Sequence, residues 1–354
     1  MSAGLTTGMR GNPSPAGGGS IRPLSLVDLP ALGHLDTTLP LGMDWELTLP
    51  LAIRLLAWRS LLPYQMSSAC SLVYLDPALQ ALVQAEARPG RDKWTVLHVA
   101  TAASADQTAL LPLLETLCTR AAAHRAGRVF AAASSDAATD LFRRLSFSAY
   151  ATETVYRLVG EETREEVVAR KPAAYAIRPQ RPRDVWGVHQ LYAAITPRPI
   201  QLIEGLISDD WESPMARWGW VPGGPLEVRL VLEAEAGIGG FVCLSRGRLG
   251  HRLQIMVDTQ HRHLATPLLQ AALGVAADWA PVPLICPLRG YQAELSLVLE
   301  AAGFQPIGEQ TLVAKEMAVR VRERLRIFEP VLERGLEPAR SGPARFSPAG
   351  EGKP

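Results

Sequence analysis

The stretch from Leu253 to Trp279 changes from a strand-like to a helix-like pattern of apolar residues. Leu253, Ile255 and Val257 occupy every second position, and this period of two predicts a β-strand. Between Leu268 and Ala276 apolar residues recur three to four positions apart, which predicts an amphipathic helix. The stretch is therefore expected to run from a strand through a polar loop into a helix.

The loop between them, Gln260 to Ala265, is a candidate anion site. Thr266 followed by Pro267 is typical of an N-cap and a first helical residue. Backbone N–H groups without partners and the helix dipole favour an anion such as phosphate just ahead of a helix. The alternative is an ordinary strand-to-helix connection that binds no ligand.

Several landmarks return along the chain at nearly constant spacing. In chain order they are Ile21-Arg22-Pro23 and Asp28-Leu29, which return 156 residues later as Ile177-Arg178-Pro179 and Asp184-Val185; Pro112-Leu113-Leu114, which returns after 155 as Pro267-Leu268-Leu269; and LFRRLSF ending at Phe147, which returns after 157 as LVLEAAGF ending at Phe304. Such regular recurrence indicates two copies of one module.

The copies define the expected domain organisation. A length of 354 residues suits two domains, which are expected at 21–159 and 175–328 with an exposed linker at 160–174. In each copy strands come first and then alternate with helices, so the fold class is α/β with a mixed sheet in each half. The Gly-, Pro- and Ser-rich ends, 1–20 and 329–354, are expected to be disordered tails.

Composition limits the classes of partner and the cell compartment. A net charge of +1 gives no reason to expect nucleic acid or an acidic membrane as a partner. No apolar run approaches the length of a membrane-spanning helix, and the first residues lack a signal-peptide core. The cysteines, which share apolar surroundings and wide spacing, are Cys70, Cys118, Cys243 and Cys286. Buried free thiols in a reducing cytoplasm are expected, with no metal site.

The order β-α-α-β-β-β-α-β-α-β, with a strand that leads into a phosphate-facing helix and a later helix that ends in Gly-Phe or Ser-Phe, resembles the GNAT superfamily of N-acetyltransferases. The resemblance covers most of 21–158 and 176–316 and so is to a tandem GNAT protein. It implies acetyl-CoA as co-substrate and a small-molecule or peptide amine as acceptor. A monomer and a homodimer both remain open, since tandem copies can meet across a pseudo-twofold contact.

The resemblance also implies where acetyl-CoA binds. The family carries Gln/Arg-x-x-Gly-x-Gly/Ala ahead of the central helix, and its backbone amides hold the pyrophosphate. This chain has His263 at the glycine position, either in this register or in a shorter one that begins at Arg262. The equivalent loop of the first copy, Thr101 to Thr108, has no glycine or basic residue and contains Asp106, so the first copy is expected to be a scaffold. The implied cofactor-binding residues are Gln260, His261, Arg262, His263, Leu264, Ala265 and Thr266, with the strand backbone of Ile255, Met256 and Val257.

Fewer residues are candidates for catalysis than for cofactor binding. The family's proton donor is commonly a Tyr five residues before the last helical Phe, where this chain has Phe142 and Leu299. Tyr291 is a candidate substitute, and packing is its alternative role. Carboxylates or His on the substrate-facing strands are candidate bases, namely Glu233, Glu235 and His251. Trp211, Trp218 and Trp220 either line an acceptor pocket or cover the core. Two functions remain: an N-acetyltransferase active in its second half, or a non-catalytic ligand sensor or interaction scaffold.

Overall fold

The computed structural model describes residues 19–36, 49–62, 68–87, 92–102, 109–158, 176–212, 227–235, 237–247 and 250–317. All of them belong to one unit, Met1–Val319. Most of the expected tail at 1–20, the expected linker at 160–174 and the expected tail at 329–354 lie outside the described residues. Among the residues that are described, no helix is both long and apolar enough to cross a bilayer.

The first half follows the order expected from its pattern. Its elements are β1 (Ser20–Pro23), the 3-10 helix η1 (Leu26–His34), β2 (Leu35–Asp36), α1 (Leu49–Ser60), β3 (Ala69–Leu75), β4 (Leu79–Ala87), β5 (Lys93–Ala102), α2 (Leu110–Ala123), β6 (Arg128–Ala133), α3 (Asp136–Arg144) and β7 (Ser148–Leu158).

The second half follows the same general order, with two helices before its hairpin and no counterpart of β2 among the described residues. Its elements are β8 (Ile177–Pro179), η3 (Pro182–Asp184), α5 (Val185–Ile195), α6 (Arg198–Glu204), η4 (Ser208–Trp211), β9 (Glu227–Ala234), β10 (Gly237–Ser245), β11 (His251–Val257), η5 (Thr259–Leu264), α8 (Ala265–Ala277), β12 (Leu284–Arg289), η6 (Gly290–Leu295), α9 (Ser296–Ala301) and β13 (Gln305–Glu316). The expected mixed α/β architecture is confirmed, although β7 and β13 are longer than their local patterns predict.

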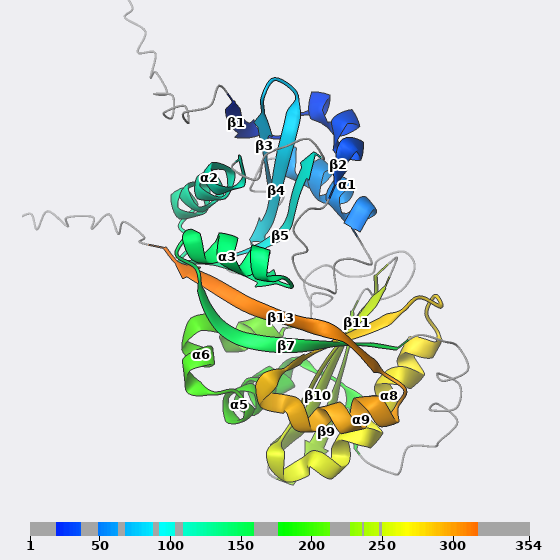
Figure 1. Cartoon of the computed structure of the whole chain (residues 1–354). Coiled ribbons are helices and arrows are strands. Elements are labelled where there is room, and N and C mark those ends of the chain that lie inside the picture. Colours follow the sequence, from blue (N-terminus) through cyan, green and yellow to red (C-terminus); the bar gives the residue numbers. More distant parts are fainter. Residues whose placement is uncertain are drawn as a thin grey trace, which may run out of the picture. The chain divides into compact units, whose positions relative to one another are not determined.

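The two halves exchange their last strands. The described strands form one sheet in the order β1-β3-β4-β5-β6-β13-β7-β12-β11-β10-β9-β8, with β2 beside β5. The last strand of the second half, β13, pairs with β6 of the first half, and β7 of the first half pairs with β12 of the second. The exchanged strands also pair antiparallel with each other and lie side by side in Figure 1. Each half therefore contributes its last strand to the part of the sheet that the other half forms.

Apolar clusters cover both faces of each part of the sheet. Helices α2 and α3 pack on one face of the first part, and α1 packs on the other. In the second part, α8 and α9 pack on one face, and α5 with η4 on the other. Val313 of β13 belongs to the first-half core and Tyr156 of β7 to the second-half core, so the exchanged strands are bound by packing as well as by backbone hydrogen bonds. The four cysteines are buried and free.

The repeated Ile-Arg-Pro and Asp landmarks form the same ion pair in both halves. Arg22 binds both carboxylate oxygens of Asp28, at 2.7 and 2.8 Å. Arg178 does the same with Asp184, at 2.6 and 2.9 Å. Each aspartate also accepts a backbone N–H three residues before it, which fixes the start of the following helix. The arginine hydrogen bonds are the main reason that the pKa of each aspartate lies below its usual value.

Candidate functional site

The gap between β11 and β12 is the centre of the candidate site. These parallel strands pair at His251 with Leu284 and at Arg252 with Ile285, and then continue unpaired with each other within the described residues. Pro287 of β12 has no N–H to donate at the point where the strands part. A backbone edge of β11 is thereby left facing a gap inside the sheet.

Ile255 is the residue of β11 whose backbone faces this gap. The side-chain amide of Gln292, from η6, donates to the Ile255 carbonyl oxygen at 3.3 Å. The N–H and C=O of one strand residue point to the same side of the strand. The Ile255 N–H therefore points into the gap as well, within the Ile255 to Val257 segment expected from the sequence.

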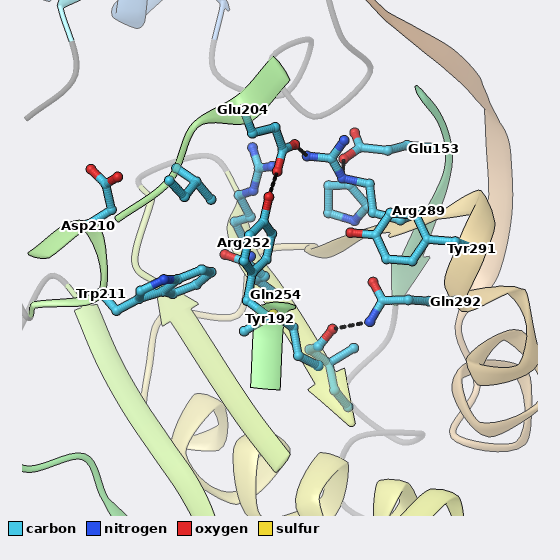
Figure 2. A pocket seen from close by; sticks show the side chains of 14 residues that line it. Glu153, Tyr192, Glu204, Asp210, Trp211, Arg252, Gln254, Arg289, Tyr291 and Gln292 are labelled. Carbon is cyan, nitrogen blue, oxygen red and sulfur yellow. Dashed lines mark hydrogen bonds and ion pairs between the residues drawn. The ribbon is translucent and has the colours of Figure 1, made fainter. Parts of the chain in front are cut away.

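A cavity of about 300 Å³ opens at the gap, on the face covered by α5 and η4. Its aromatic wall consists of Tyr192, Trp211 and Tyr291, and Figure 2 shows these rings around the cavity. Leu206 and Met256 add apolar surface. Three carboxylates and two guanidinium groups also line it, from Glu153, Glu204, Asp210, Arg252 and Arg289.

Arg289, the last residue of β12, joins two of these carboxylates (Figure 2). Its Nε lies 2.9 Å from Glu153 Oε1, and its Nη2 lies 2.7 Å from Glu204 Oε1. Burial alone would lower the pKa of Arg289, but the charges of Glu153 and Glu204 outweigh it and raise that pKa. A permanently charged guanidinium is therefore held between two carboxylates.

The same carboxylates have further partners that fix their orientation. The Tyr192 hydroxyl donates to Glu204 Oε2 at 2.7 Å, and Gln310 donates to Glu153 Oε2 at 2.6 Å. Glu204 is the last residue of α6, where Gly205 takes the left-handed conformation, with φ of 52°, that commonly ends a helix. Glu153 belongs to the exchanged strand β7, so the first half supplies one charge of a cavity built in the second.

Asp210 is held from the first half as well. The Ile207 N–H donates to Asp210 Oδ2 at 2.9 Å, which fixes the η4 turn. The Lys93 ammonium group of β5 lies 3.5 Å from the same oxygen and donates to the Gly205 carbonyl at 2.5 Å. Lys93 therefore ties the loop that follows α6 to the sheet.

Tyr291 is the expected catalytic residue that the structure places at the cavity. Its hydroxyl lies 3.3 Å from Thr196 Oγ1, and burial raises its pKa. A raised pKa keeps the phenol protonated at neutral pH, so that it can donate a proton. Leu299 and Phe142, at the family's usual tyrosine position, are buried in the two cores.

Glu233 and His251 do not line the cavity. Glu233 is bound by Arg178 at the β8–β9 edge and remains half-exposed. His251 is buried beside Trp279, accepts the Gly247 N–H at Nδ1, and lies 3.0 Å from the Ala280 carbonyl through Nε2. This placement corrects the expectation that they face the substrate, because alternation along β11 turns His251 away from the face that bears Arg252. Glu235, the other candidate, likewise lies outside the cavity lining.

The expected pyrophosphate loop forms a 3-10 helix. Thr259–Leu264 runs directly into α8, which begins at Ala265, so Thr266 is not the N-cap. His263 does not adopt positive φ, and the described loop has no residue that does. Leu264 and Ala265 are buried, whereas Gln260, Arg262, His263 and Thr266 are exposed.

Asp258 caps this 3-10 helix with its own negative charge. Its carboxylate accepts from Gln260 N and lies 2.9 Å from His261 Nδ1. Burial alone would raise its pKa, but hydrogen bonds, above all from His261, lower it, so the carboxylate is charged at neutral pH. An internal anion therefore lies where the family pattern places a diphosphate. Arg262 lies 3.2 Å from Glu294.

Other parts of the expected sites lie outside the described residues. In the first-half loop, residues 103–108, including Asp106, are not among the described residues, and neither are Trp218 and Trp220. Trp211 both lines the cavity and belongs to the core cluster of α5. The sequence left two roles open for Trp211, lining a pocket or covering the core, and its side chain does both.

No protein-family model matches the chain, and no curated protein matches it by sequence. Solved structures do. A tandem GNAT protein from the clavulanic acid biosynthesis pathway, solved without acetyl-CoA, aligns over 84% of this chain and 98% of its own, with 13% identity and a TM-score of 0.52. The chain has a tandem GNAT fold. A GCN5-related N-acetyltransferase from Sphaerobacter thermophilus aligns over 84% of this chain and 95% of its own, with 14% identity and a TM-score of 0.54.

A third tandem-length match is a putative acetyltransferase from Pyrococcus horikoshii. It aligns over 89% of this chain and 94% of its own, with 11% identity and a TM-score of 0.52. At such low identity these matches show the fold alone. Within this tandem GNAT fold, the charged residues of the cavity were not singled out from the sequence, although Arg289 at the end of an apolar strand offered a weak signal.

Proposed function

We propose that the protein is an acyl-CoA-dependent N-acyltransferase that acylates an amine in the cavity of its second half. One observation carries the proposal: the cavity opens at the β11–β12 gap, where a backbone N–H, a protonated tyrosine and carboxylates converge. Hydrogen-bond donors aimed at a developing oxyanion, and groups that exchange protons with the amine and the leaving group, are what acyl transfer to an amine requires.

The residues divide the chemistry between them. The acyl-CoA would supply an acyl group as a thioester. The Ile255 N–H would donate to its carbonyl oxygen, and a cavity carboxylate, Asp210 or Glu204, would take the proton that the ammonium loses. The Tyr291 hydroxyl would give its proton to the sulfur as the C–S bond breaks, and it would regain a proton from the nitrogen of the tetrahedral intermediate, which thereby becomes the neutral amide. The amine nitrogen gains the acyl group, and free CoA is released.

The acyl end of the co-substrate fits this chain better than the diphosphate end. The gap and Tyr291 suit a thioester, and the exposed Arg262 and His263 side chains offer charge or hydrogen bonds near a diphosphate. The negative charge of Asp258 would repel a diphosphate at this loop. The glycine that would permit close approach of the backbone to the diphosphate is also absent. These two features favour a second candidate function, an amine-binding sensor that has kept the fold without catalysis.

An assay of the full chain separates these functions. Acetyl-CoA is incubated with a panel of primary amines, while released thiol is followed colorimetrically and acylated amine by mass spectrometry. For an enzyme, Tyr291→Phe should lower the turnover number roughly 100-fold, as loss of a general acid does, whereas Tyr74→Phe, far from the cavity, should not change it. Thiol release absent with every amine, together with retained amine binding, would support the sensor instead.

A further inference from the structure

We propose that Lys93, in the first half of the chain, is a positioning residue for acyl transfer in the second half. It holds the segment 205–211, which forms one wall of the cavity, in the place where that wall binds the amine. The proposal rests on the proposed function, because it assigns Lys93 a role in that reaction. Lys93 is not among the described residues that line the cavity, so it acts on the amine through this segment.

The Lys93 ammonium group is buried against the segment. Only 7% of the Lys93 side chain is exposed, and a lysine is almost never buried unless its charge is paired. Both of its partners among the described residues belong to the segment. They are the Gly205 carbonyl oxygen, at 2.5 Å, and Asp210 Oδ2, at 3.5 Å. Lys93 therefore binds the segment near both of its ends.

The beginning of the segment is also closely packed against the first half. Gly205 has a φ of 52°, and a Cβ at this position would lie 2.5 Å from Arg128 Nη1 and 3.9 Å from Lys93 Cε. Lys93 and Arg128 are partners where β5 and β6 begin. Two neighbouring side chains of the first half thus determine where the chain can run after α6.

The segment carries part of the cavity wall, and its two ends are anchored differently. Leu206, Asp210 and Trp211 line the cavity. The Trp211 carbonyl oxygen accepts hydrogen bonds from Gln180 and Arg229 of the second half. Trp211 is therefore held independently of Lys93, whereas Leu206 and Asp210 lie in the part of the wall that Lys93 binds.

A wall that contacts the amine before and during the reaction affects KM rather than kcat. Its displacement weakens the binding of the ground state and of the transition state alike, which raises the KM for the amine and leaves kcat unchanged. A variant that is merely less stable contains fewer active molecules, which lowers the apparent kcat and leaves KM as it was. The ratio of the two parameters therefore separates a positioning role from a structural one.

Lys93→Met tests the proposal, because it keeps the long apolar stem and removes the ammonium group. Lys93→Gln, which is neutral and shorter, is measured beside it so that the result does not depend on the folding of one variant. Lys315→Met is the matched control: it removes a lysine from β13 whose ammonium lies over the Phe147 ring, 5.9 Å from its centroid.

Two measurements are made on the full chain. Steady-state kinetics with acetyl-CoA are recorded for 3-methylbutylamine, 2-phenylethylamine and putrescine. Hydrogen exchange of the backbone amides is followed by mass spectrometry without any substrate. The second measurement reports on the segment whether or not the protein turns over an amine.

Both Lys93 variants should raise the KM for the acylated amine about tenfold, as loss of a hydrogen bond from a charged group predicts. The kcat and the KM for acetyl-CoA should stay unchanged. The amides of Ile207 and Asp210, which are hydrogen-bonded within the segment, should exchange roughly tenfold faster, and those of α5 should exchange as in wild type. Lys315→Met should change none of these quantities.

Three results would overturn the proposal. With acylation by wild type intact, unchanged exchange in the segment, or faster exchange with an unchanged KM for the amine, would sink the positioning role and leave the proposed function standing. A lower kcat with an unchanged KM would give Lys93 a structural role only. No acylation of any of the amines by wild type would count against the proposed function, and the positioning role would fall with it.

Discussion

Gln310 donates a 2.6 Å hydrogen bond to Glu153, although the two residues come from the last strands of different halves, 157 residues apart. They are direct partners in the β7–β13 ladder and occupy equivalent places in the two copies. At this position the two copies have diverged. The first copy carries Glu153, whose carboxylate binds Arg289, and the second carries Gln310, whose amide orients that carboxylate. The exchange of strands thus makes the cavity of the second half depend on both halves.

Glu153→Gln should destabilise the protein by about 3 kcal/mol, because removal of one partner of a buried ion pair leaves charge uncompensated. The buried Arg289 would retain only Glu204 as a counter-ion. Urea unfolding at neutral pH measures the effect. Glu309→Gln, on an exposed position of the same ladder, is the control and should change stability by less than about 0.5 kcal/mol. Equal effects of the two substitutions would show that the ion pair adds nothing specific.

Asp184 should contribute to stability at neutral pH and lose that contribution in acid. Its pKa is lower in the folded state than in the unfolded chain, chiefly because of the Arg178 hydrogen bonds. The contribution is therefore complete above the unfolded value of about 4 and falls as the pH drops through the folded value. Asp184→Asn should cost roughly 2 kcal/mol at pH 7 and much less at pH 2.

The control for this experiment is Asp76→Asn, which removes a carboxylate from an exposed turn. Unfolding midpoints in urea at pH 7, 4 and 2 give the comparison. A penalty for Asp184→Asn that stays constant over this range would contradict a stabilising charge at this position.

Because of His98, the free energy of unfolding should fall as the pH drops from 6.5 to 4. Burial in β5 lowers the pKa of His98 to about 4, whereas the unfolded chain binds its proton near pH 6.5. The unfolded state therefore binds more protons in this window, and stability falls as the pH falls. The loss is on the order of 3 kcal/mol for one group.

Thermal unfolding across this window tests the assignment. His98→Gln should flatten the slope between pH 6.5 and pH 4, and His34→Gln, at an exposed position, should leave it unchanged. If the slope survives in His98→Gln, another group causes it.

Asp258→Asn should strengthen the binding of acetyl-CoA, because it removes the internal anion that caps η5. The gain is expected to be roughly fivefold, about 1 kcal/mol for a charge near a solvent-exposed diphosphate. His263→Glu adds negative charge to the same loop and should have the opposite effect. Calorimetric titration measures both, and Asp278→Asn, at the other end of α8, is the control. A weaker complex with Asp258→Asn would mean that the diphosphate does not bind at this loop.

Local pattern predicted much of the architecture. The α2 helix, the β10–β11 strands and the recurrence of Arg22 with Asp28 at Arg178 and Asp184 all follow from period and spacing, since backbone periodicity and short-range pairing act over a few residues. Tyr291, which the sequence placed at the start of the last helix, lies in η6 and lines the cavity, and its catalytic role stays a prediction. Local pattern failed at Thr266: an N-cap signal was present, but the helix begins earlier because η5 runs straight into it.

The sequence by itself determined the doubled order of elements, the mixed sheet and the burial of the four cysteines, because each depends on alternation or composition within a short segment. Only the tertiary structure decided that β7 and β13 change places. Each strand carries a pattern that fits either copy, and the choice depends on packing against residues far away in the chain. The same holds for the cavity: Glu153, Glu204 and Arg289 look like ordinary surface charges one at a time, and they become a buried network only when three distant segments meet.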